Sequence, residues 1–351
     1  MRVITLDIVR FFAAMSVVLY HYISRPGSEI YPTIDQFTKY GYLGVPLFFI
    51  ISGYVIALSA HNRTAIQFGI SRFVRLYPAL WAGVLFTVFC LTILNHTKFT
   101  LLQILANFAL INEYFGFDNV DGVYWTLKAE LRFYACVFIL LLCGVFQKYR
   151  YWLSAWLGMT ALYATSGQPF FMGWFITPEY SSFFIGGIAA FLIQTNGKTI
   201  FNLFVFFSSL VISSFMAFNQ TQGFIANPGV MEKSISAAIV WLFYCLFFLI
   251  STGKINLAER KLFIIFGALT YPLYLIHNLA GKAIIDSYSA IIPAQIMVLL
   301  VIALMIFFSF IIHIGIERPL ASPMKAFLLS KLSRAKPSPN QCGQPILPKT
   351  H

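Results

Sequence analysis

Arg10 and His21 are ionisable residues inside the first long apolar stretch, LDIVRFFAAMSVVLYHY, which runs from Leu6 to Tyr22. On a helix, a spacing of eleven residues is about three turns, so both side chains share one face and lie about 16 Å apart in depth. Because ionisable groups within a membrane span are costly, they mark a functional site. We therefore predict a cation near one membrane surface and an imidazole near the other. The alternative is an arginine and a histidine that reach opposite headgroup layers and share no function.

A second set of charges lies in the fourth apolar run, which begins VYWTLKAELRFYACV at Val123. Lys128, Glu130 and Arg132 are hard to explain as lipid-facing groups. Glu130 lies about six residues, or about 9 Å, from the outer end of this run, and His21 approaches the same half of the membrane. A carboxylate beside an imidazole fixes its tautomer and raises its basicity, so we expect Glu130 to orient His21. The alternative is a Glu–Arg or Glu–Lys pair that only holds helices together.

Charged residues at the cytoplasmic ends of two further runs either bind an anion or have a structural role. Arg72 and Arg75 in SRFVRLYP are three positions apart, so a helix places them on one face. Guanidinium groups bind phosphate in a bidentate fashion, so the pair suits the phosphate-rich end of a nucleotide-bearing donor. The alternative is that they are ordinary positive-inside charges. In HIGIERPL we expect a structural His313 and an ion pair of Glu317 with Arg318 at the helix end.

Small and aromatic residues elsewhere have both a packing and a functional interpretation. Ser52 and Gly53 in GYLGVPLFFIISGYVIALS either allow close helix packing or let a substrate approach the backbone. His277 in TYPLYLIHNLAG is either a packed core residue or part of the site. Together with the residues above, they give a set of candidate substrate-lining positions. These are Ser52, Gly53, Trp125, Lys128, Arg132, Tyr274 and His277.

The composition indicates a membrane protein. The 351-residue chain is 59% apolar and only 10% charged, whereas about a quarter of the residues of a soluble domain are charged. We predict an all-α, polytopic transmembrane bundle of about ten spans. The net charge of +12 follows from basic residues in alternate loops, so it places both termini in the cytoplasm and gives no support for a nucleic-acid partner. The predicted spans are 5–23, 41–60, 77–95, 123–146, 151–167, 179–195, 199–218, 234–252, 262–284 and 295–316.

The sequence also indicates how the chain is divided and whether it binds a metal. We divide the chain into a transmembrane domain, 1–320, and a cytoplasmic tail, 321–351. The end of the tail, AKPSPNQCGQPILPKTH, is rich in proline and polar residues, which is typical of disorder. The five cysteines show no metal-ligand spacing, so we expect no metal site.

Six motifs together resemble those of the integral-membrane acyltransferase-3 family, whose members transfer acyl groups to surface sugars. They are the R-x10-H pair of Arg10 and His21, FFIISG at 48–53, the R-x-x-R pair of Arg72 and Arg75, WTLKAELRFY at 125–134, TYPLYLIH at 270–277 and IERP at 316–319. They occur in the family's order over nearly the whole chain. The resemblance implies proton abstraction or acyl handling by His21 and acyl-donor binding by Arg72 and Arg75. It also implies the stand-alone membrane type, without an extra-cytoplasmic hydrolase-like domain.

The function that these observations predict is an acetyl-CoA-dependent O-acyltransferase, multi-pass in the inner (plasma) membrane of a bacterium and surrounded by membrane lipids. It moves an acetyl or similar acyl group from cytoplasmic acyl-CoA to a hydroxyl of a surface polysaccharide or lipid-linked sugar. His21 and Glu130 are the expected catalytic residues, and Arg10, Arg72 and Arg75 the expected donor-binding residues. Acetyl-CoA is then a substrate, and we expect no bound cofactor.

Two alternatives stay open at this point. His21 acts either as a general base or through a transient acyl-imidazole. The protein could also be a transporter or flippase of a sugar–lipid intermediate, with buried His and Glu residues as a proton relay. Against the second alternative, the sequence shows no internal repeat and no matched pair of interrupted spans.

Overall fold

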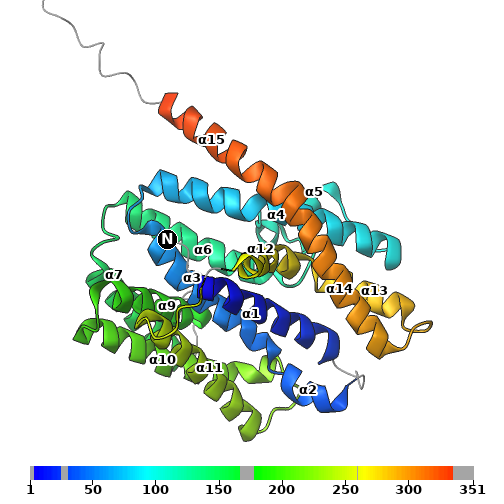
Figure 1. Ribbon diagram of the computed structural model, residues 1–351, viewed down its shortest axis with the longest axis horizontal. Coiled ribbons are helices and arrows are strands. Elements are labelled where there is room, and N and C mark those ends of the chain that lie inside the picture. The colour runs from blue at the N-terminus through cyan, green and yellow to red at the C-terminus, as the bar shows by residue number, and fades with distance from the viewer. Residues whose placement is uncertain (1–3, 25–30, 167–177, 259, 335–351) are drawn as a thin grey trace, which may run out of the picture.

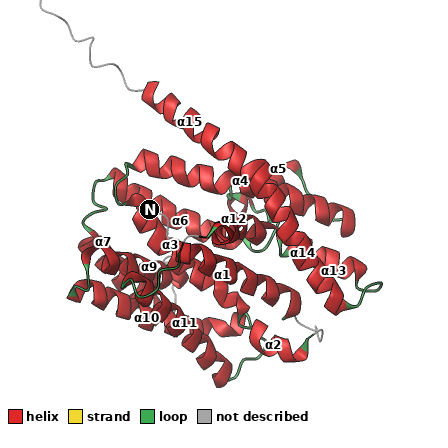
Figure 2. Cartoon of the chain, in the orientation of Figure 1, coloured by secondary structure: helices red, strands yellow, loops and turns green. Residues whose placement is uncertain are grey.

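The computed structural model of the protein describes residues 4–24, 31–166, 178–258 and 260–334. All regular elements in these ranges are helices (Figure 1, Figure 2), which confirms the predicted all-α class. In chain order they are α1 (Ile4–Ile23), α2 (Pro32–Thr38), η1 (Gly41–Leu43), α3 (Gly44–Ala60), α4 (Ala65–Leu94), α5 (Leu101–Phe108), η2 (Asn112–Phe115), α6 (Tyr124–Leu142), α7 (Tyr149–Thr165), α9 (Pro178–Asn196), α10 (Ile200–Gln220), η3 (Thr221–Gly223), α11 (Val230–Ser251), α12 (Lys261–Ile276), α13 (Leu279–Tyr288), α14 (Ala294–Ile312), the π-helical η4 (His313–Glu317) and α15 (Arg318–Arg334).

The structure confirms a polytopic membrane protein. Within the described ranges, six helical stretches are long and apolar enough to cross a membrane. A seventh crossing results if α12 and α13, which bend by 68° at a short break, form one span. The six stretches are Ile4–Ile23, Pro32–Ala60, Ala65–Leu94, Ile200–Gly223, Val230–Ser251 and Ala294–Lys331. Length and composition therefore support fewer crossings than the ten that the sequence predicted.

The three other predicted spans, α6, α7 and α9, are helices with less apolar or shorter sequences. α6 contains Lys128, Glu130 and Arg132 within 19 residues, and α7 has only 17 residues. α9 begins with Pro178 and Glu179 and is nearly buried among α3, α7, α10 and α11. A helix surrounded by other helices needs little apolar surface of its own toward lipid. The number of ten spans and the cytoplasmic placement of both termini stay predictions.

α1 separates two apolar cores at the centre of the bundle (Figure 1). The first core is built mainly from α3, α6, α7, α9, α10 and α11 and includes Leu6 and Ala13 of α1. The second is built mainly from α4, α12 and α14 and includes Ala14 and Val17 of α1. Because α1 contributes to both cores, its polar residues lie where the two halves of the bundle meet.

The closest helix packing occurs between α3 and α9, and glycines make it possible. A Cβ atom at Gly53 would collide with the backbone carbonyl of Phe184, and one at Gly187 with the carbonyl of Ile50. Small residues allow helix backbones in membranes to approach each other in this way. The structure therefore supports the packing interpretation of Gly53, and its contact with a substrate stays a prediction.

The C-terminal end of the described chain is one long helical rod. α14 continues through the π-helical turn η4 into α15, which projects from the bundle in Figure 1. The predicted tail, 321–351, thus begins as helix up to Arg334, and its remaining residues lie outside the described ranges.

We predict that Gly187→Ala weakens the α3–α9 contact, because the added methyl group has no space. Overpacking of this kind typically costs about 1–3 kcal/mol. Thermal unfolding of the protein in detergent measures the loss. The matched control is Gly158→Ala in α7, where the methyl group meets no other atom within 4 Å. Equal melting temperatures for the two variants would contradict the tight contact.

Candidate active site

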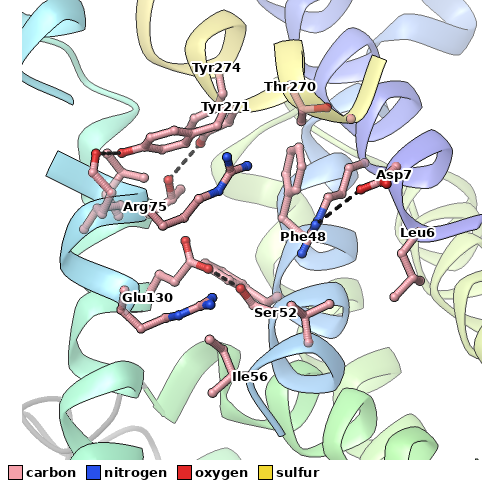
Figure 3. A pocket seen from close by; sticks show the side chains of 18 of the residues that line it. Leu6, Asp7, Phe48, Ser52, Ile56, Arg75, Glu130, Thr270, Tyr271 and Tyr274 are labelled. Atoms are coloured by element: carbon pink, nitrogen blue, oxygen red, sulfur yellow. Dashed lines mark hydrogen bonds and ion pairs between the residues drawn. The ribbon is translucent and has the colours of Figure 1, made fainter. Parts of the chain in front are cut away.

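A cavity of about 540 Å³ lies between α1, α3, α4, α6 and α12, and also reaches His313 of η4. This volume is in the range of small-molecule sites. Figure 3 shows Arg75 pointing into the space between Glu130 and Ser52 on one side and Tyr271 and Tyr274 on the other. The polar side chains that line the cavity are Asp7, Arg10, Ser52, Arg72, Arg75, Thr126, Glu130, Tyr134, Thr270, Tyr271, Tyr274 and His313.

The three arginines predicted to bind the donor all line this cavity, Arg10 from α1 and Arg72 and Arg75 from α4. Arg10 of α1 lies 3.8 Å from the Asp7 carboxylate, one turn away. Arg75 of α4 pairs with Glu317 of η4. Arg72 has no carboxylate within ion-pair distance in the described part of the chain, and its Nη2 and Nε bond to serine hydroxyls. Arg72 therefore makes no direct ion pair in the described part of the chain, although Glu130 lines the same cavity and acts on it electrostatically.

Glu317 differs from its prediction in a way that matters for the cavity. The sequence suggested an ion pair with Arg318 at the end of a helix, but the Glu317 carboxylate binds Arg75 and, at 2.8 Å, Nδ1 of His313. His313 and Glu317 both lie on η4, where the π-helical geometry gives a wider turn than an α-helix has. Glu317 is 5% exposed, so it compensates Arg75 without contacting bulk water.

Glu130 lies in the cavity with the arginines and not beside His21, so the prediction that it orients His21 is wrong. Its carboxylate accepts hydrogen bonds from the hydroxyls of Ser52 and Tyr134. The physical reason is the depth of α6 relative to α12. Thr126 already lies level with Tyr274, to which it bonds at 2.9 Å, and Glu130 lies one helical turn further along α6.

Three other candidate residues of α6, Trp125, Lys128 and Arg132, lie outside the cavity lining, and their contact with a substrate stays a prediction. Lys128 is buried and pairs with Glu113 at 2.7 Å, so it fastens α6 to the η2 turn. Arg132 does not contribute to the lining. Trp125 packs against Tyr180, with 5.1 Å between the ring centroids. Ser52 and Tyr274, by contrast, line the cavity.

His21 and His277 form a direct hydrogen bond, with 2.9 Å between Nδ1 of His21 and Nε2 of His277. Nδ1 of His277 lies 2.8 Å from the carbonyl oxygen of Tyr274 and 3.2 Å from that of Leu273. Carbonyl oxygens only accept, so this nitrogen carries a hydrogen, and a neutral His277 then presents its Nε2 lone pair to His21. His21 must donate through Nδ1, which leaves its Nε2 as a basic atom.

The burial of the two rings differs. His277 is completely buried, whereas His21 is only half-buried. The His21 ring thus contacts a second ring, that of His277, which is held by hydrogen bonds to the backbone of α12. Such a chain of groups holds a general base in one tautomer and one orientation, the role that a carboxylate has in hydrolase triads.

A clamp of two side chains holds the helix break that follows His277. The Tyr22 hydroxyl donates to the His277 carbonyl at 2.6 Å. Asp121, in the loop before α6, accepts from the Asn278 side chain at 2.7 Å and from the Leu279 backbone N–H at 2.8 Å, so it caps α13. Burial raises the pKa of Asp121, while these hydrogen bonds lower it.

Sequence reasoning missed Asp121 because nothing local marks it. In the sequence Asp121 is an ordinary acidic loop residue, and its partners Asn278 and Leu279 are 157 and 158 residues away. Tyr134, which holds Glu130, was also missed. Its position four residues after Glu130 was the available signal, because residues at that spacing share a helix face.

The cavity and the histidine pair are adjacent but separate. Neither histidine lines the cavity. Tyr274 lines it, and its ring lies 5.5 Å from that of His277 and 5.6 Å from that of Phe48. The side chains of Tyr274 and Phe48 thus form an aromatic layer between the arginines and the histidines.

The fold and these two sites define a class: a helical, multi-pass membrane protein with an arginine-lined cavity next to a pair of hydrogen-bonded histidines. Comparison with known proteins gives the family. Residues 3–314 match the acyltransferase domain of the acyltransferase-3 family, so the chain belongs to this family of membrane acyltransferases.

One curated relative shows a weaker similarity. The chain is 26% identical over 200 residues to Nodulation protein 10 of Rhizobium leguminosarum bv. viciae. The match covers 50% of this chain and 53% of that protein, so the chain spans about half the length of the relative. No solved structure matches the chain.

We predict that Asp121→Ala lowers the acyltransferase rate about 10- to 100-fold, because the freed break no longer fixes His277. Hydrogen bonds to a charged group contribute about 1.5–3 kcal/mol each, and about 1.4 kcal/mol is a factor of ten. Asp121→Asn, which keeps one acceptor, should lose less. Acyl transfer in isolated membranes is the measurement. The control is Asp118→Ala, at an exposed residue of the same loop; equal rates for both alanine variants would contradict the clamp.

Proposed function

We propose that the protein transfers an acetyl or similar acyl group from cytoplasmic acyl-CoA to a hydroxyl group of a surface polysaccharide or a lipid-linked sugar. Membership of the acyltransferase-3 family supports acyl transfer over transport. The single observation that carries the chemistry is the hydrogen bond between His21 and His277, which leaves a basic nitrogen at the outer end of α1. The orientation used here, with Arg10 near the cytoplasm, is that predicted from the loop charges.

The donor binds in the cavity through its phosphates. In the described residues Arg72 makes no direct ion pair, and Arg10 and Arg75 face the same space. A guanidinium group binds phosphate through two parallel hydrogen bonds, which gives both affinity and orientation. The thioester end of the donor then extends along α1 toward His21, a depth difference of about 16 Å.

The reaction needs two proton transfers, one from the acceptor hydroxyl to His21 and one from His21 to the leaving thiolate. Nε2 of His21 removes the proton of the acceptor hydroxyl, and the oxygen attacks the thioester carbonyl carbon. The C–S bond breaks, and the proton on His21 passes to the leaving thiolate. The imidazolium that forms between these steps is stabilised by the fixed acceptors behind it, Nε2 of His277 and, through that ring, the carbonyls of Leu273 and Tyr274.

The aromatic layer must open for the thioester to reach His21. Tyr274 is held by a hydrogen bond of 2.9 Å to Thr126 and by ring contacts to Phe48 and His277. A change of the Tyr274 rotamer would join the cavity to the histidine pair. In this proposal the layer keeps water and the donor apart from His21 until the acceptor is present.

We predict that His21→Ala lowers kcat by at least about 100-fold, the usual contribution of a positioned general base. His277→Leu should lower kcat as well, because it leaves the Nδ1–H of His21 without an acceptor. His277→Gln should recover part of the rate through its side-chain oxygen. The assay follows labelled acetyl groups from acetyl-CoA to the glycan fraction of membranes.

The control for the histidine variants is His96→Asn, at an exposed histidine with φ of 54°, a conformation that asparagine tolerates. Full O-acetylation of the glycan by His21→Ala membranes would disprove the assignment of the base.

We predict that Arg72→Gln raises the KM for acetyl-CoA about 10- to 100-fold with a small change in kcat, since charge-assisted hydrogen bonds contribute about 1.5–3 kcal/mol. Arg132→Gln, which changes an arginine outside the cavity, should leave this KM unchanged. An unaltered KM in Arg72→Gln membranes, or an equal increase in both variants, would rule out the cavity as the donor site.

A further inference from the structure

A second group of cationic and hydroxyl side chains lies at the turn between α3 and α4, beside the cavity. Nη1 of Arg63 lies 3.3 Å from Oγ of Ser59 and 3.1 Å from Oγ of Ser71. Arg72 binds the same two hydroxyls, with Nη2 3.3 Å from Ser59 and Nε 3.4 Å from Ser71. Two guanidinium groups are therefore held side by side by two shared serines.

Neither guanidinium group of this arrangement makes a direct ion pair with a described residue. In the described ranges, no carboxylate lies within ion-pair distance of Arg63 or of Arg72. Two like charges this close repel each other, and hydroxyl groups offset little of that repulsion. Arg10 and Arg75 differ from this pair, because each has a carboxylate nearby. The geometry thus favours an anion that both Arg63 and Arg72 can bind.

The position of the pair relates it to the cavity. Arg72 and Arg75 line the cavity, whereas Ser59, Arg63 and Ser71 do not. Arg63 is exposed, and Arg72 is half-buried, so the pair bridges the surface and the interior. If a ligand in the cavity carries a further anionic group at the end nearest the α3–α4 turn, that group lies beside Arg63 and Arg72.

We propose that Arg63, Arg72, Ser59 and Ser71 bind the phosphomonoester on the ribose of the acyl donor, the 3′-phosphate of coenzyme A. A phosphomonoester carries nearly two negative charges at neutral pH and three acceptor oxygens, which matches two guanidinium forks. The two serine hydroxyls can turn to donate to the same oxygens. The proposal rests on the proposed function, because it takes acyl-CoA to be the donor.

The test compares acetyl-CoA with acetyl-3′-dephospho-CoA as donors, using membranes that contain the full chain. For the unaltered protein, we expect a KM about 10- to 100-fold higher for the dephospho donor, with similar kcat. Arg63→Gln should raise the KM for acetyl-CoA to the value for the dephospho donor and leave that second value unchanged. Turnover of the dephospho donor at the normal kcat shows in the same assay that the variant is folded.

The matched control is Arg150→Gln in α7, where the guanidinium lies over the ring of Phe201. This variant should keep the full difference between the two donors. If the unaltered protein uses both donors equally, or if Arg63→Gln keeps the difference, the phosphomonoester site is wrong while acyl transfer from acetyl-CoA stands. If neither donor supports acyl transfer by the unaltered protein, the proposed function fails, and this site fails with it.

Discussion

The arrangement of the histidine site depends on the hydrogen bond between His21 and His277. This bond joins the first helix to a residue 256 positions later, at the point where α12 breaks. The break frees the backbone there, and Tyr22 and Asp121 occupy the freed groups. Without that support the second imidazole could not keep its Nδ1 on the α12 carbonyls, and the tautomer of the first would not be defined.

Charge compensation in the membrane interior sets the second constraint. The cavity contains three arginines, which are costly to bury, and the chain places Asp7, Glu130 and Glu317 around them. Two of these carboxylates lie close to one arginine each, and Glu130 is held by two hydroxyls. This partial neutralisation makes the site tolerable when empty. It also leaves Arg72, with Arg63 beside it, without a direct ion pair in the described residues, which is why we propose this pair as a phosphate site.

The aromatic layer of Phe48 and Tyr274 gives the two sites different surroundings. On one side lies the cavity with its three arginines, and on the other lie His21 and His277. This separation keeps the arginines out of direct contact with the two imidazoles. A transferase needs this separation, because hydrolysis of the thioester competes with transfer to the acceptor.

The sequence alone determined the helical class, the family, and the local geometry of single helices. Arg10, Arg72 and Arg75 were predicted to bind one ligand, and the structure places all three in one cavity. The sequence did not give the contacts between helices. Glu130 was assigned to His21, Lys128 to the substrate and Glu317 to Arg318, whereas the structure places them next to Ser52, Glu113 and Arg75.

Only the tertiary structure decided those partners, for a physical reason. The periodicity of a helix fixes which of its own residues share a face and at what depth. It does not fix how the helix rotates or slides against another helix hundreds of residues away, because many apolar faces pack almost equally well in a membrane. A shift of one turn separates Glu130 from the level of Tyr274 and gives the base a histidine as its neighbour instead of a carboxylate.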